Sequence, residues 1–115
     1  KKIDVAKIGA AVRHAAVFAP AGVNVDFVSW QEDSVFVRTF EKGVEAETFA
    51  CGSGAVAVAL ACQLKKGYTK PLRVFFKLGQ LVVEFNKEKE ALLKGRGQLV
   101  FTGTLHAAPQ VDQKI

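Results

Sequence analysis

The residue with the clearest capacity for chemistry is Cys51, which opens the Cys-Gly-Ser-Gly turn at positions 51–54. An unbroken run of small apolar residues follows and extends to residue 62, which predicts a helix that begins in the turn, with Ser53 or the turn itself as its cap. The first backbone N–H groups of a helix lack partners within it, and the helix dipole is positive there. The turn therefore predicts a thiol beside free amides, an environment that favours the thiolate and binds carboxylates.

Three roles are open to Cys51: metal ligand, structural residue or reactive thiol. A metal site would need further ligands, but Cys62 lies inside the predicted helix and neither histidine has ligand spacing. Structural cysteines usually lie in apolar surroundings rather than in a glycine-containing turn. A reactive thiol would have a carboxylate nearby, Glu41 or Glu47, with which to exchange a proton. These comparisons favour a reactive or binding cysteine and predict no metal site.

The segments before Cys51 predict a strand pair that leads into the cysteine turn. Apolar side chains alternate along residues 23–30, and a polar connection separates this strand from a second one at 35–40. The second strand is followed by Glu41 and Lys42, in a charged loop that runs directly to the cysteine turn. The loop is close to the thiol in sequence. A role in the site and an ordinary exposed ion pair therefore explain Glu41 and Lys42 equally well.

Similar local signals predict the other elements. The spacing of apolar residues predicts a helix over residues 3–15 and strands over residues 72–77, 80–85, 91–94 and 98–105. The helix after Cys51 has no polar face, which predicts burial on all sides. One such helix among hairpin-connected strands indicates an α+β domain, with a mostly antiparallel curled sheet wrapped around a central apolar helix. We expect one domain over residues 1–105 and a flexible tail over residues 106–115.

Composition limits the class of protein. The chain has 115 residues, enough for one domain with a core. Its net charge of +5 comes from basic residues that are scattered along the chain. This charge is only weak support for an anionic ligand, and it is no stronger support for nucleic acid. The apolar run is too short to cross a bilayer, and two cysteines that form no disulfide framework favour a cytoplasmic protein. The chain contains no methionine, even at its start, which indicates a fragment or an excised domain.

Longer motifs around Cys51 resemble a known family. Arg-Thr-Phe-Glu-Lys-Gly at 38–43 and Glu-Thr-Phe-Ala-Cys-Gly-Ser-Gly-Ala at 47–55 closely resemble the second active-site motif of diaminopimelate epimerases. Gly-Val-Asn-Val-Asp-Phe-Val at 22–28 is similar to a strand of that family, and residues 79–85 and 99–103 are similar to its closing strands. The resemblance covers about residues 3–105 and corresponds to the C-terminal catalytic half of such an enzyme.

The resemblance implies a cofactor-independent epimerase that interconverts LL- and meso-diaminopimelate in the pathway to lysine and peptidoglycan precursors. The family has two similar domains that each supply one cysteine, with the substrate between them. One thiolate removes the α-proton while the other thiol delivers a proton to the opposite face. The implied partners are therefore the substrate and a missing N-terminal domain with the second cysteine, but neither nucleic acid nor a membrane. Apolar surface left by the missing half would also allow a homodimer.

The resemblance assigns roles to four residues near the reacting carbon. Cys51 becomes one of the two acid/base thiols, and its role alternates with the direction of the reaction. Glu41 resembles the residue that meets the substrate ammonium and pairs with Cys51. Gly52 and Ser53 are expected to bind the reacting carboxylate through their backbone N–H groups.

The distal end of the substrate is assigned to Asn24 and Lys42, and here the chain departs from the family. Lys42 replaces an arginine, which exchanges a bidentate guanidinium for a point charge. The loop at 44–47 is one residue longer than the common pattern, and Cys62 on the helix interior cannot replace the missing second cysteine. The departures leave the substrate range open.

Two other functions remain alternatives. One is another isomerase of the same fold, such as a proline racemase or a phenazine-pathway type, although Glu-Lys-Gly followed by Ala-Cys-Gly-Ser-Gly favours the epimerase. The other is a binding or assembly module that uses the anion site at the helix end without chemistry.

Overall fold

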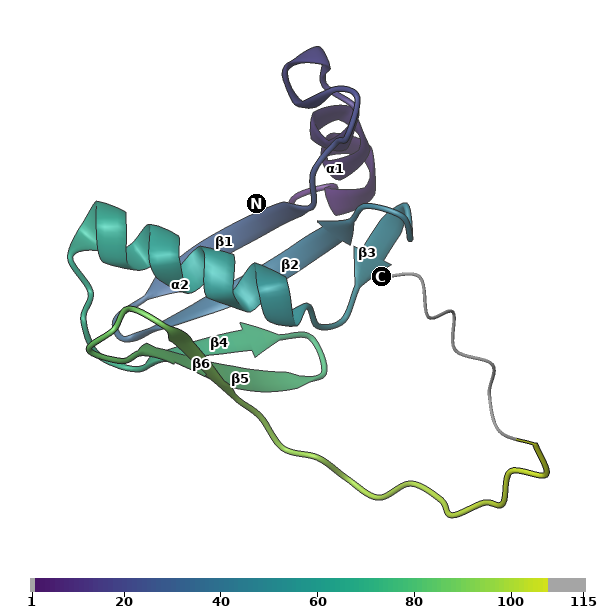
Figure 1. The fold of residues 1–115 in the computed structure, drawn as a ribbon. Helices are drawn as coiled ribbons and strands as arrows, with labels where there is room; N and C mark the ends of the chain where they lie inside the picture. The colour runs from purple at the N-terminus through teal and green to yellow at the C-terminus, as the bar shows by residue number, and fades with distance from the viewer. Residues whose placement is uncertain (1, 108–115) are drawn as a thin grey trace.

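The computed structural model describes residues 2–107, and the predicted tail lies outside the described residues from position 108 onward. Within the described range the elements are α1 (Val5–Arg13), the 3-10 turn η1 (Ala16–Phe18), β1 (Val25–Gln31), β2 (Ser34–Glu41), β3 (Ala46–Thr48), α2 (Gly52–Lys66), β4 (Leu72–Phe76), β5 (Gly79–Phe85) and β6 (Ala91–Lys94) (Figure 1). This is the predicted α+β class. No helix in this part of the chain is long and apolar enough to span a membrane.

The strands form one sheet in the order β1-β2-β4-β5-β6, with β3 paired to β2 off this path. The β2–β4 pair is parallel and all other pairs are antiparallel, so the prediction of a mostly antiparallel sheet is confirmed. The two strands of this pair are parallel because the connection between them contains α2, a crossover helix that runs over one face of the sheet (Figure 1). Both ends of α2 are thereby fixed to the sheet.

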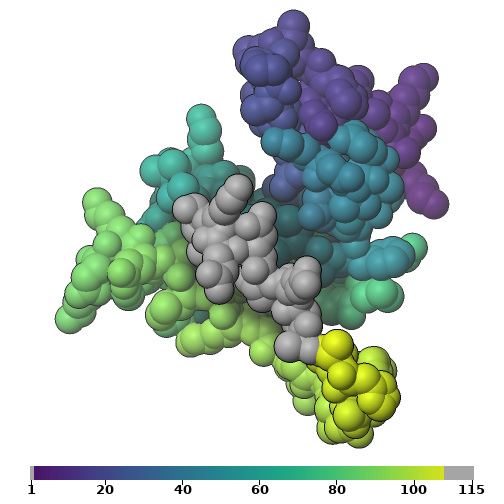
Figure 2. Space-filling model, turned by 45° about the vertical axis from the view of Figure 1, so that its right-hand side comes forward, coloured from purple at the N-terminus to yellow at the C-terminus, as the bar shows by residue number. Residues whose placement is uncertain are grey.

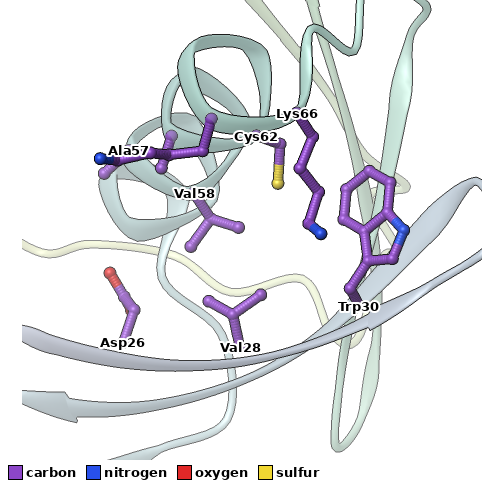
Figure 3. Close-up of a pocket in the computed structure, with 9 residues that line it drawn as sticks. Asp26, Val28, Trp30, Ala57, Val58, Cys62 and Lys66 are labelled. Atoms are coloured by element: carbon purple, nitrogen blue, oxygen red, sulfur yellow. The ribbon is translucent and has the colours of Figure 1, made fainter.

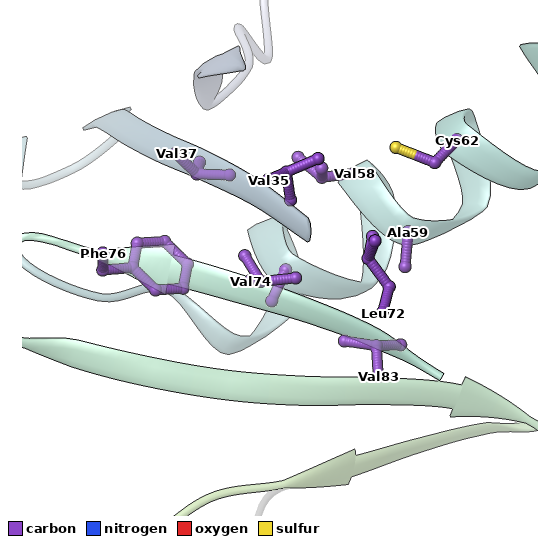
Figure 4. Packing of buried hydrophobic residues seen from close by; sticks show 10 residues of the cluster. Val35, Val37, Val58, Ala59, Cys62, Leu72, Val74, Phe76 and Val83 are labelled. Carbon is purple, nitrogen blue, oxygen red and sulfur yellow. The ribbon is translucent and has the colours of Figure 1, made fainter. Parts of the chain in front are cut away.

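The core lies between α2 and the sheet. Val35 and Val37 are two residues apart on β2, so their side chains point to the same face of the sheet, and both are almost fully buried. Side chains of β4, β5 and α2 complete the cluster shown in Figure 4, among them Val58, Ala59, Leu72, Val74, Phe76 and Val83. This contact fixes α2 on one face of the sheet.

The helix α2 ends as predicted but is buried differently. Lys65 and Lys66 lie in its last turn, and Gly67 closes it in the left-handed conformation at φ 63°. The prediction that this helix is buried on all sides is wrong within the described part of the chain, where Leu60 and Leu64 are 45% and 74% exposed. The sheet covers only one side of the helix, so an apolar face remains uncovered.

The helix α1 packs against β2 at the end of the sheet that carries β3. The Asp4 carboxylate caps it by accepting the Lys7 N–H at 3.0 Å. Gly9 allows the close approach, because a Cβ at this position would lie 2.5 Å from the Cβ of Phe40. The chain before β1 is therefore tied to the strand that leads to the charged loop.

Two strand predictions differ from the structure. The short strand β3 (Ala46–Thr48) was not expected, because only its pairing with β2 defines it. The strand expected at 98–105 is wrong, since this segment has no strand partner within residues 2–107. Leu99, Phe101 and Leu105 are each 81% exposed there, and the segment projects from the body of the molecule (Figure 2). A segment with alternating apolar residues forms a strand only when it can pair with the edge strand of a sheet.

Candidate active site

Cys51 occupies the junction between β3 and α2, and its sulfur caps the helix. The residue has extended backbone angles, φ −145° and ψ 112°, and its Sγ accepts the Gly54 N–H at 3.3 Å. The hydroxyl of Ser53 lies 3.4 Å from the same sulfur. The expected cap was Ser53 or the turn itself, so the structure moves this role to the thiol. Cys51 is 8% exposed and therefore buried, although it does not belong to the apolar cluster between α2 and the sheet.

The first two amides of α2 fit the predicted anion site. The next two amides are engaged: the Gly54 N–H donates to the Cys51 sulfur, and the Ala55 N–H donates to the Cys51 carbonyl at 2.9 Å. No hydrogen bond within residues 2–107 uses the N–H groups of Gly52 and Ser53. Two amides beside one sulfur, at the positive end of a helix, can bind a carboxylate.

An aspartate on β1 leaves little room for a side chain at position 54. A Cβ at position 54 would lie 2.9 Å from Oδ1 of Asp26. The same oxygen accepts the Thr39 hydroxyl at 2.6 Å, which fixes the carboxylate in this place. The glycine in the cysteine turn thus lets the start of α2 lie directly against β1.

The structure brings three of the predicted site residues together in the charged loop. The Lys42 N–H donates to Oδ1 of Asn24 at 2.8 Å, which ties the loop to the chain before β1. The Glu41 carbonyl accepts the Glu45 N–H at 2.8 Å and closes the turn. Glu41 is half-buried and Lys42 is exposed. Within residues 2–107 no hydrogen bond or ion pair joins the Glu41 carboxylate to Cys51, and the roles of both remain predictions.

Two ion pairs in this region have no counterpart among the predicted roles. Arg38 holds Glu47 through two hydrogen bonds, at 2.6 and 2.7 Å, and Arg13 holds Glu45 at 2.8 Å. The hydrogen bonds from Arg38 lower the pKa of Glu47, and the same contact raises the pKa of Arg38. Glu47, one of two carboxylates suggested for proton exchange with Cys51, is thus engaged by a guanidinium. The charges are visible in the sequence, but the Arg38–Glu47 pair depends on β3 lying beside β2, and the Arg13–Glu45 pair depends on α1 lying beside this part of the chain.

The second thiol, Cys62, lies in a different environment. It faces a groove of about 510 Å³ between α2 and β1, with Val28 and Trp30 on the opposite side (Figure 3). Burial raises the pKa of Cys62, and both cysteines are free thiols. The groove is mostly apolar and is not lined by Cys51. The geometry agrees with Cys62 as an interior residue of the helix.

The fold and the site together define an α+β domain that presents a thiol and two free amides at the start of its helix. A sequence model of the family "Diaminopimelate epimerase" matches residues 1–102. The chain therefore belongs to the diaminopimelate epimerase family.

Individual relatives agree with this assignment. The chain is 43% identical over 109 residues to the diaminopimelate epimerase of Aquifex aeolicus, an alignment that covers 91% of this chain and 39% of the relative. It is 40% identical to that of Chlorobaculum tepidum, with 90% of this chain and 42% of the relative covered. For Archaeoglobus fulgidus the identity is 39%, with 89% and 36% covered. The chain thus spans well under half the length of these relatives.

Proposed function

We propose that this chain is the part of a diaminopimelate epimerase that supplies one of its two acid/base cysteines. The complete protein would interconvert LL- and meso-diaminopimelate and serve the synthesis of lysine and peptidoglycan precursors. The observation that carries the proposal is Cys51 at the start of α2, with the unpaired amides of Gly52 and Ser53 beside its sulfur. Family membership adds independent support.

The proposed reaction consists of two proton transfers. The substrate carboxylate binds the amides of Gly52 and Ser53, which places the α-carbon near Cys51. The Cys51 thiolate takes the α-proton, and the electron pair of the broken C–H bond stays on the substrate. The two amides stabilise that charge as it spreads onto the carboxylate. The second thiol then delivers a proton to the opposite face, so the centre inverts without pyridoxal or another cofactor.

The charged loop is proposed to bind the rest of the substrate. Glu41 would meet the α-ammonium, and Lys42 and Asn24 would reach the distal amino-acid end. The hydrogen bond from Lys42 N–H to Asn24 Oδ1 supports a common role, because it holds these two residues at the same place. The single charge of Lys42 would bind a distal carboxylate with less geometric restriction than an arginine.

The proposal includes a partner domain for this chain. The chain covers only 39% of its Aquifex aeolicus relative, and inversion needs proton transfer on both faces of one carbon. We expect the second cysteine in an N-terminal domain, no epimerisation by the 115-residue chain alone, and self-association where the uncovered apolar faces meet. The free thiols fit a cytoplasmic location.

The decisive experiment is exchange of the α-proton into D₂O with LL-diaminopimelate and the complete protein, followed by NMR. Cys51→Ala and Cys51→Ser should abolish exchange and epimerisation. Cys62→Ala is the matched control, because it removes a thiol of similar burial from the same helix. Normal epimerisation by Cys51→Ala would refute the proposal.

One observation supports each alternative. Lys42 in place of the usual arginine fits another isomerase of this fold, and a screen of amino-acid substrates would reveal one. The 8% exposure of Cys51 fits an anion-binding or assembly module without chemistry. In that case substrate analogues would bind, but the Cys51 thiol would react with alkylating reagents no faster than that of Cys62.

A further inference from the structure

The loop between Glu41 and Cys51 carries two carboxylates that are held by different arginines. Glu45 pairs with Arg13 of α1 and is 42% exposed in its side chain. Glu47 pairs with Arg38 of β2, and these two side chains are 29% and 30% exposed. Glu47 is therefore the more shielded of the two carboxylates, although Arg13 at 15% is less exposed than Arg38, and Glu47 is also closer in sequence to the thiol.

Arg38 joins three segments of the chain. Its Nε and Nη2 donate to both carboxylate oxygens of Glu47, at 2.6 and 2.7 Å. Its Nη1 donates to the carbonyl of Ile3 at 3.1 Å, just before α1. A bidentate pair of this kind fixes orientation as well as distance. Arg38 thus holds β3 and the N-terminal segment against β2.

Few other interactions hold the chain between Glu47 and Cys51. The strand β3 (Ala46–Thr48) pairs with β2 through three residue pairs. Phe49 and Ala50 follow it without strand pairing, and both are exposed. The ammonium of the exposed Lys77 lies over the Phe49 ring, 5.3 Å from its centroid. Among the side-chain hydrogen bonds and ion pairs within residues 2–107, the Arg38–Glu47 pair is therefore the last one before the thiol.

We propose that Arg38 and Glu47 are positioning residues for Cys51. They hold β3 on β2, so that the chain enters α2 with the Cys51 sulfur directed at the Gly54 N–H. The proposal rests on the proposed function only for the catalytic use of Cys51, because the positioning itself can be measured without turnover.

The test compares Glu47→Gln with Glu45→Gln in the intact protein by amide hydrogen exchange and by alkylation with iodoacetamide. Each variant neutralises one ion-paired carboxylate in the same loop. Glu47→Gln should accelerate exchange at the Gly54 amide by about tenfold, because the turn opens more often. It should accelerate alkylation of Cys51 and leave Cys62 and the amides of residues 58–62 unchanged. Glu45→Gln should change none of these rates.

Two results would overturn the proposal. One is an unchanged Gly54 amide in Glu47→Gln, and the other is equal acceleration along the whole of α2, which would indicate a general loss of stability. If Glu47→Gln does not fold, Arg38→Lys replaces it, since lysine keeps the charge but not the bidentate contact, and the same local acceleration is expected. Local acceleration in a protein that cannot exchange the α-proton of diaminopimelate would refute the proposed function but support the positioning role.

Discussion

The sulfur of Cys51 accepts the backbone N–H of Gly54 at 3.3 Å, so the residue proposed for proton transfer is also the N-cap of α2. Side chains that accept at this position stabilise the helix they begin, whereas alanine cannot accept. The proposed proton transfer and the observed helix cap therefore use the same sulfur atom. Variants of Cys51 must be judged on both.

We predict that Cys51→Ser and Cys51→Ala differ in stability but not in activity. The serine hydroxyl can accept the Gly54 N–H, so Cys51→Ser should unfold in urea close to the wild-type midpoint. Cys51→Ala should lose about 1 kcal/mol of unfolding free energy. Both should be inactive in the complete protein. Equal stability of the two variants would contradict the capping role.

The contact between Gly54 and Asp26 predicts a costly substitution. Gly54→Ala places a Cβ 2.9 Å from Oδ1 of Asp26 and should lower the unfolding free energy by about 1–3 kcal/mol. Gly52→Ala is the control, because its Cβ would meet only the flexible end of Leu93, at 3.1 Å. Removing the carboxylate with Asp26→Ala should make Gly54→Ala less costly. Additive effects in this double-mutant cycle would argue against the contact.

The Arg38–Glu47 pair predicts a dependence of stability on pH. Hydrogen bonds from Arg38 lower the pKa of Glu47 in the folded state, so the folded protein binds fewer protons at this carboxyl than the unfolded chain. The pair therefore stabilises the fold above the ordinary range of glutamate, near 4.3, and this contribution is lost as the pH falls through the depressed pKa.

The expected difference between wild type and Glu47→Gln is about 0.5–1 kcal/mol at neutral pH, kept small because both side chains retain partial exposure. It should vanish in acid, where the wild-type carboxyl is protonated. Urea unfolding of both proteins across this pH range provides the measurement. A difference that is constant with pH would show that packing, not charge, accounts for it.

The two free cysteines should differ in reactivity under native conditions. Their exposures, 8% for Cys51 and 7% for Cys62, are nearly equal, so access alone does not distinguish them. Burial raises the pKa of Cys62, which disfavours its thiolate, whereas the Cys51 sulfur lies at the start of α2 and accepts a backbone N–H there. Alkylation at mildly acidic pH, followed by peptide mass analysis, should modify Cys51 first. Faster reaction of Cys62 would contradict the proposed acid/base role of Cys51.

Most elements could be predicted from the sequence because their signals are local. The alternation in residues 23–30 and 35–40 gave the β1–β2 pair, and the apolar run after Cys51 gave α2. The strand β3 could not be predicted in this way, because three residues carry too short a pattern. The predicted strand at 98–105 has a strong pattern but no partner in the described residues, so the local signal was insufficient.

The sequence by itself determined that a thiol stands where a helix begins, since glycine turns and apolar periodicity act over a few neighbouring residues. Only the tertiary structure decided that this thiol caps the helix, that Asn24 holds Lys42, and that Arg38 holds Glu47. These contacts join residues from separate segments or depend on the exact path of the backbone. They are set by strand register and packing, which no single stretch of sequence encodes.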